Sequence, residues 1–176
     1  MHDERERVVA MLRTSGGAFL DLAESADDAR WGLAPSWGGW SLAEVAEHVT
    51  LVETGVAKLI QRKLFAEPAP VELLVETRGK DERIDDYQAD RTNRRTAPEF
   101  VTPRGMWPSR VELIAAFRDG RAAVVAGVEA APGDLRVYAA IHPILGPLDA
   151  YQWALFLARH LERHLIQMEE ILAELG

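Results

Sequence analysis

Three long segments of the sequence each begin with a pair of residues that can cap a helix. In such a pair, each side chain accepts a hydrogen bond from a backbone N–H that would otherwise lack a partner at the helix start. The apolar residues that follow recur every three or four positions, as they do in an amphipathic helix. The pairs are Ser41 with Glu44, Ser109 with Glu112, and Asp149 with Gln152. The sequence therefore predicts long helices over residues 41–65, 109–129 and 149–175.

A fourth helix is predicted near the N-terminus, where apolar residues keep the same spacing. Gly16 and Gly17 are expected to bend it, because glycine weakens a helix interior. No stretch alternates with period two for long enough to compete with these helices. A chain of 176 residues is also too short to make two comfortable domains. We therefore expect an all-α protein, a four-helix bundle forming a single domain over residues 1–176.

The second and third helices are separated by a long segment that contains several prolines and many charges, residues 66–108. A connection of this length can return the chain to the other end of the bundle, so that the two helices run parallel. Long irregular segments in compact domains are often functional or locally helical. The stretch "VELLVET" predicts one short helix there, and the charged run from Asp81 to Asp86 is interpreted as solvated surface.

Charge and composition exclude several classes of function. The net charge is −8 and the acidic residues are spread along the chain, which argues against nucleic acid or an anionic membrane as a partner. The absence of cysteine excludes disulfides, thiolate metal sites and a cysteine nucleophile. No stretch approaches the roughly 18 apolar residues of a membrane span. We expect a cytoplasmic protein that acts on a small molecule.

Three histidines are predicted to point into the bundle. His160 and His164 are four residues apart, and a helical projection places both on the apolar stripe of the last helix. His48 lies on the apolar face of the second helix. Unpartnered imidazoles in a core would cost roughly several kcal/mol, so these rings require partners. Three neutral imidazoles can hold a divalent metal with an open coordination position. The alternative is that they are ordinary hydrogen-bonded core residues.

Neighbouring residues could support or line such a site. Glu44 lies one turn before His48 and could accept a hydrogen bond from its ring, although its capping role is the favoured interpretation. Gln167, one turn past His164, is a comparable candidate, or it could simply bond to a neighbouring helix. His142 precedes Pro143 in a turn and is interpreted as a residue that shapes this loop and could line the mouth of the site. No catalytic residue is assigned.

The histidine pair differs from the H-E-x-x-H motif of zinc peptidases. Leu161 follows the first histidine, and Glu162 projects to the opposite side of the helix. A peptidase is therefore disfavoured, because the general base of that motif is missing.

Two segments resemble the DinB/YfiT-like superfamily. "PSWGGWSLAEVAEHVTLVE" is similar to its W-S-x-x-E-V-x-x-H segment, and "HPILGPLDAYQWALFLARHLERHLIQMEEIL" is similar to its final helix. The resemblance implies a four-helix bundle with a long crossover after the second helix. It also implies one divalent metal per chain, held by His48, His160 and His164. Zinc, nickel and iron all suit three imidazoles.

Members of that superfamily with a known activity are metal-dependent transferases or isomerases that use a low-molecular-weight thiol such as bacillithiol or mycothiol. The resemblance therefore implies a thiol transferase that takes its thiol from outside the chain. A hydrolase that uses a metal-bound water and a non-catalytic stress protein that binds a metal or a small ligand remain alternatives. Leu155 and Ile166 lie on the charged side of the last helix, which we expect the crossover or a second subunit of a homodimer to cover.

Overall fold

Four long helices form the body of the protein in the computed structural model, which describes residues 2–90 and 96–176. They are α1 (His2–Ser25), α3 (Leu42–Leu59), α6 (Arg110–Ala130) and α7 (Ala150–Leu175). Complete capping boxes begin α3, with Ser41 and Glu44, and α7, with Asp149 and Gln152. At the start of α6, the Ser109 side chain accepts from the backbone N–H of Glu112. The predicted helical fold is confirmed.

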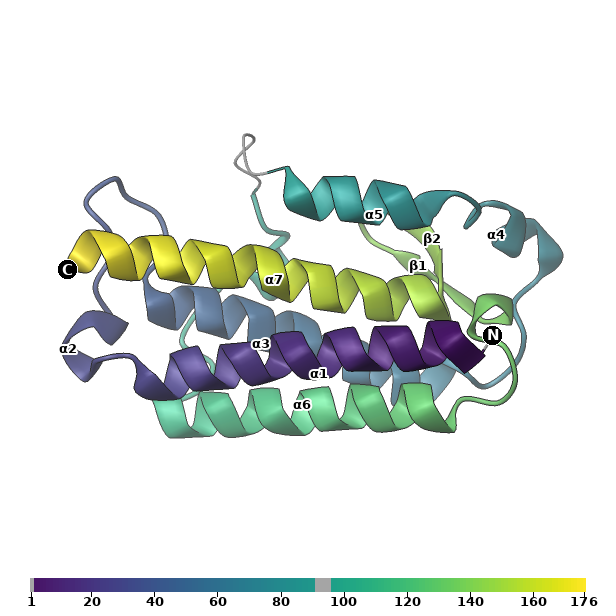
Figure 1. Ribbon diagram of the computed structural model, residues 1–176, viewed down its shortest axis with the longest axis horizontal. Coiled ribbons are helices and arrows are strands. Elements are labelled where there is room, and N and C mark those ends of the chain that lie inside the picture. The colour runs from purple at the N-terminus through teal and green to yellow at the C-terminus, as the bar shows by residue number, and fades with distance from the viewer. Residues whose placement is uncertain (1, 91–95) are drawn as a thin grey trace.

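The helices are arranged so that α1 and α3 each pack against both α6 and α7. Figure 1 shows α3 and α6 running in the same direction, as do α1 and α7. The chain must therefore travel the length of the bundle between α3 and α6, and the predicted crossover is confirmed. None of the described helices is both long and apolar enough to cross a bilayer.

The crossover contains more regular structure than the sequence predicts. A π-helical turn, η1 (Ile60–Leu64), ends α3, and it is followed by α4 (Val71–Val75), α5 (Lys80–Ala89) and the 3-10 turn η2 (Glu99–Val101). The short helix expected in "VELLVET" is α4. The charged side chains of residues 81–86 are exposed or half-exposed, as expected for surface, but the run forms α5, which lies along α7 (Figure 1) with Ile84 buried. One buried isoleucine among so many charges is too weak an apolar signal to predict a packed helix.

A small hairpin precedes α7 where only a turn was expected. Strand β1 (Ala139–His142) pairs antiparallel with β2 (Gly146–Asp149), and His142 lies opposite Gly146. Two strands of four residues are too short to give a recognisable period-two pattern. Two further short elements, α2 (Asp28–Trp31) and the 3-10 turn η3 (Leu135–Val137), complete the described structure.

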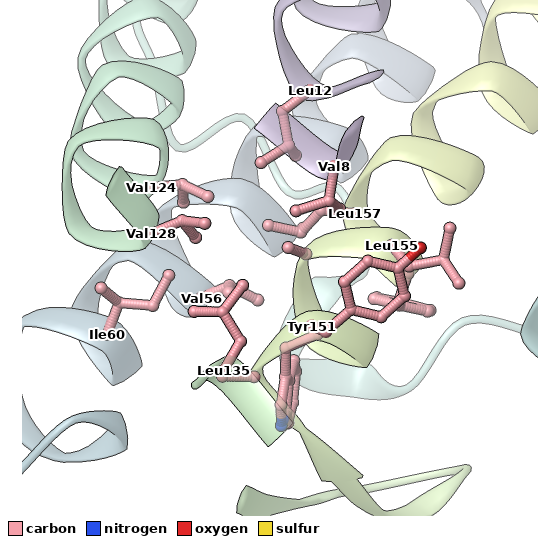
Figure 2. Close-up of a cluster of buried hydrophobic side chains, with 14 of the residues drawn as sticks. Val8, Leu12, Val56, Ile60, Val124, Val128, Leu135, Tyr151, Leu155 and Leu157 are labelled. Carbon is pink, nitrogen blue, oxygen red and sulfur yellow. The ribbon is translucent and has the colours of Figure 1, made fainter. Parts of the chain in front are cut away.

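The core consists of two apolar clusters. Figure 2 shows the cluster nearer the hairpin, where Val8, Val56, Val124 and Leu157 bring together α1, α3, α6 and α7. The other cluster lies nearer the opposite end of the bundle and includes Phe19, Leu42, Phe117, Met168 and Ile171.

Three buried polar residues form a layer between the two clusters: Ser15, Glu53 and Arg121. Along α1, α3 and α6, each of them lies between the residues of one cluster and those of the other. The Nε and Nη2 atoms of Arg121 donate to the two carboxylate oxygens of Glu53, each at 2.8 Å, and its Nη1 donates to Ser15 Oγ at 3.1 Å. Helix α1 continues through Gly16 and Gly17 without a break. A Cβ atom on Gly16 would come within 3.2 Å of Arg121 Cγ, so this glycine gives the arginine room.

Candidate metal centre

The three histidines predicted to be ligands lie together between α3 and α7. The ring centroid of His48 lies 5.1 Å from that of His160 and 4.8 Å from that of His164, and the two rings of α7 are 4.5 Å apart. One nitrogen from each ring lies within 4.8 Å of the other two. The structure therefore brings the whole predicted ligand set to one place.

Two of these rings are oriented by a hydrogen bond from their outer nitrogen. His48 Nδ1 donates to the carbonyl oxygen of Val101, in η2, at 2.8 Å. His164 Nδ1 donates to Gln167 Oε1 at 2.9 Å. In both rings Nε2 is then the nitrogen that can serve as a ligand. An oxygen acceptor on the outer nitrogen is characteristic of histidines that bind metals.

The spacing of two of the inner nitrogens fits a divalent metal. His48 Nε2 lies 3.2 Å from His160 Nε2. Two nitrogens bound to one tetrahedral zinc at about 2.0–2.1 Å would be separated by about 3.3 Å. Three protein ligands leave a further position for an external ligand, as in catalytic rather than structural zinc sites.

The protonation states of the histidines also suit metal binding. Burial lowers the pKa of His48, an effect that its hydrogen bond to Val101 opposes. Burial lowers the pKa of His160 well below its usual value, and positive charge on His164 or His48 would lower it further. Both rings are therefore neutral near pH 7, which is the form that a metal requires.

Glu47, which the sequence analysis did not single out, fastens the crossover beside His48. Its buried carboxylate accepts hydrogen bonds from the backbone N–H groups of Arg104, Gly105 and Met106 at 2.9–3.0 Å. Burial acts to raise the pKa of Glu47, but the three N–H donors outweigh it and the pKa is lowered. Adjacent residues of α3 thus hold the crossover at two points, His48 at Val101 and Glu47 at residues 104–106.

Aromatic rings surround the histidines. The ring of Trp40 lies 5.0 Å from that of His48, and the ring of Phe156 lies 5.3 Å from that of His160. Phe156 also contacts His142, with the two ring centroids 4.5 Å apart. The His142 Nδ1 accepts from the backbone N–H groups of Ile144 and Leu145, each at 3.1 Å, which is the geometry expected of a residue that shapes the hairpin turn.

The other polar residues considered in the sequence, Glu44, Gln167 and Glu162, each have a hydrogen-bond partner that accounts for their position. The Glu44 carboxylate accepts from the backbone N–H of Ser41 at 2.8 Å, and the acceptor at His48 Nδ1 is Val101 instead. Gln167 bonds to His164 as the sequence suggested. Glu162 pairs with Arg159 at 2.9 Å on the other side of α7.

A cavity of about 540 Å³ lies elsewhere, lined by parts of α4, α5 and the start of α7, and none of the three histidines lines it. Arg136 there pairs with Glu4, Asp81 and Asp149. These charges satisfy one another, so the cluster of three histidines remains the candidate site.

Comparisons with known proteins agree with this fold. A family model described as the DinB superfamily matches residues 11–168. The uncharacterised protein YuaE of Bacillus subtilis (strain 168) is 26% identical over 137 residues, which cover 78% of this chain and 80% of that protein. A crystal structure of TT2238, described as a four-helix bundle protein, superimposes with a TM-score of 0.56 at 21% identity. That match covers 94% of this chain and 98% of TT2238 and shows a shared fold.

Proposed function

Because the chain belongs to the DinB superfamily, we propose that it is a divalent-metal-dependent transferase that uses a low-molecular-weight thiol similar to bacillithiol or mycothiol. The observation that carries the proposal is the group of three inward imidazoles, His48, His160 and His164, with their ligand nitrogens within 4.8 Å of one another. Three ligands would hold one zinc, nickel or iron ion per chain and leave room for an external ligand.

The proposed chemistry needs a thiol from outside, because the chain contains no cysteine. When bound, the metal would lower the pKa of a thiol so that the reactive thiolate forms near neutral pH. The sulfur then bonds to an electrophilic carbon of the substrate, and the displaced group leaves with the bonding electron pair and takes up a proton.

The chain itself contributes positioning to this reaction. Val101 and Gln167 hold the rings of His48 and His164 in the orientation that presents Nε2 to the metal. Trp40 and Phe156 contact the ligand rings and reduce access of water to them. Aromatic rings beside the histidines favour an electrophile that has an apolar part.

Metal content is the first test. We expect elemental analysis of the protein, purified without a histidine tag, to find about one divalent metal per chain. We expect a His160→Ala variant to lose nearly all of it, because two imidazoles bind far more weakly than three. A Glu162→Gln variant is the matched control on the same helix, since Glu162 pairs with Arg159, and it should retain the metal.

Activity is the second test. The metal-loaded protein is mixed with 1-chloro-2,4-dinitrobenzene and with bacillithiol, mycothiol or cysteine, and the release of chloride is followed. We expect conjugation only when metal and thiol are both present. Hydrolysis of an ester without thiol would instead assign a hydrolase. Tight metal binding with no thiol binding or turnover would assign a non-catalytic metal-binding protein.

A further inference from the structure

His142 is held as a neutral ring with its proton on Nε2. Its Nδ1 accepts two backbone N–H groups, from Ile144 and Leu145, and a ring nitrogen that accepts cannot also carry a proton. Burial lowers the pKa of His142 to about 4, with a further contribution from the positive charge of Lys80, so the ring stays neutral at pH 7. The remaining nitrogen, Nε2, is therefore a hydrogen-bond donor.

This donor has no acceptor in the part of the protein that the structure describes. The side chain is buried, with 5% of its surface exposed. Nothing in residues 2–90 or 96–176 accepts a hydrogen bond from its Nε2–H. Nε2 is not among the fully buried side-chain atoms of the described residues that lack a partner, so this atom is open to solvent. An open N–H donor of this kind is available to an external partner, either water or a ligand.

The position of the ring connects this donor to the metal centre. His142 lies between Trp153 and Phe156, with centroids at 5.0 and 4.5 Å. Phe156 in turn contacts His160. Residues 153, 156 and 160 follow one another along a single face of α7.

A neutral N–H group among aromatic rings has a clear chemical preference. It binds most strongly to an oxygen with full or partial negative charge, as a carboxylate or a polarised carbonyl provides. We propose that His142 Nε2–H donates a hydrogen bond to such an oxygen of the substrate, so that the site selects electrophiles bearing a carbonyl or carboxylate group. This inference rests on the metal-binding part of the proposed function and not on the thiol.

One substitution separates this role from loop shaping. In His142→Asn, the amide oxygen replaces Nδ1 as the acceptor for Ile144 and Leu145, but the Nε2–H donor is lost. In His142→Ala both are lost. If His142 only shapes the hairpin, the asparagine variant should bind ligands as the wild type does.

The test uses protein loaded with Co²⁺, whose visible spectrum reports on exogenous ligands. Acetate supplies the oxygen probe, and ethanethiol is a control probe that has no oxygen. We expect His142→Asn to bind acetate about tenfold more weakly, equal to the loss of about 1.4 kcal/mol. Its cobalt content and its affinity for ethanethiol should be unchanged. Acetate affinity within about twofold of wild type would overturn the inference.

A measurement on the wild type makes the test independent of how well the variant folds. In zinc-loaded protein, a ¹⁵N–¹H spectrum should show the His142 proton on Nε2, and its signal should shift when acetate is added. A proton on Nδ1, or a signal that acetate leaves unmoved, would contradict the inference. If cobalt binds but ethanethiol does not, the thiol proposal fails while acetate still tests His142. If no metal binds, both proposals fall.

Discussion

At the scale of single residues, Gln167 controls the orientation of His164. We expect Gln167→Leu to weaken metal binding by about 10- to 100-fold, because the ring loses the acceptor that fixes its tautomer and its direction. Competition with a chromophoric chelator measures this affinity. Glu169→Gln changes an exposed residue of the same helix and should leave the affinity as it is. Wild-type affinity in Gln167→Leu would show that the hydrogen bond plays no part in the site.

Residues of the candidate site whose side chains lie on a helix face could be predicted from the sequence, whereas residues that act through the backbone or through tertiary contacts could not. The projection of helix faces found His48, His160 and His164, and a spacing of one turn found Gln167. Val101 could not be found, because it acts through its backbone carbonyl, which every residue has. The role of Glu47 depends on three N–H groups of a segment whose path is set by tertiary packing.

At the scale of elements, the close approach of α6 to the end of α3 depends on a glycine. A Cβ atom on Gly127 would come within 2.3 Å of Ile60 Cγ2, whereas a Cβ on Gly17 would meet no atom within 4 Å. We expect Gly127→Ala to lower the free energy of unfolding by about 1–3 kcal/mol through overpacking. Gly17→Ala should raise it by up to about 1 kcal/mol through helix propensity. Urea unfolding measures both, and changes of the same sign would contradict this account.

Elements that are encoded by local sequence signals were predicted, and elements that depend on tertiary contacts were not. The long helices have caps at their starts and an apolar face that repeats over many turns, so they are visible in the sequence. Helix α5 and the hairpin are short, and contacts with the rest of the protein hold them. Lys80 Nζ, for example, donates to the carbonyl oxygens of Leu145 and Pro147 and joins the two elements.

At the scale of the whole molecule, stability should depend on pH through the buried histidines. The pKa of His142 is about 4 in the folded protein and about 6.5 when unfolded. Below pH 6.5 the unfolded chain therefore binds more protons, and stability falls as the pH falls. From pH 7.5 to pH 6, His142 alone should cost about 0.8 kcal/mol.

Urea unfolding of the metal-free protein at these two pH values tests this expectation. The pKa values of His48 and His160 are also lowered, so they add to the loss. The pKa of Asp149 is raised by burial to about 6, which acts in the opposite direction, mainly below pH 6. The loss should be smaller by about 0.8 kcal/mol in His142→Asn. An equal loss in both proteins would show that His142 is not buried as a neutral ring.

The outer side of α7, which carries Leu155 and Ile166, was expected to be covered by the crossover or by a second subunit. Leu155 is buried there and belongs to the same apolar cluster as Ile84 of α5, which lies along this helix (Figure 1), so the crossover covers this part of the helix. Ile166 remains exposed. A homodimer stays a prediction, for which light scattering of the purified protein is the direct measurement.

The polar layer fixes the axial register of α1, α3 and α6. Sliding α6 by one turn, about 5.4 Å, would carry Arg121 into an apolar cluster and leave Glu53 as an unpaired buried charge. Losing one partner of a buried ion pair costs about 3–5 kcal/mol. Neighbouring registers, which apolar side chains alone would tolerate, are therefore disfavoured. Since Glu53 and His48 share α3, the ion pair helps to fix the height of His48 along the bundle relative to α1 and α6.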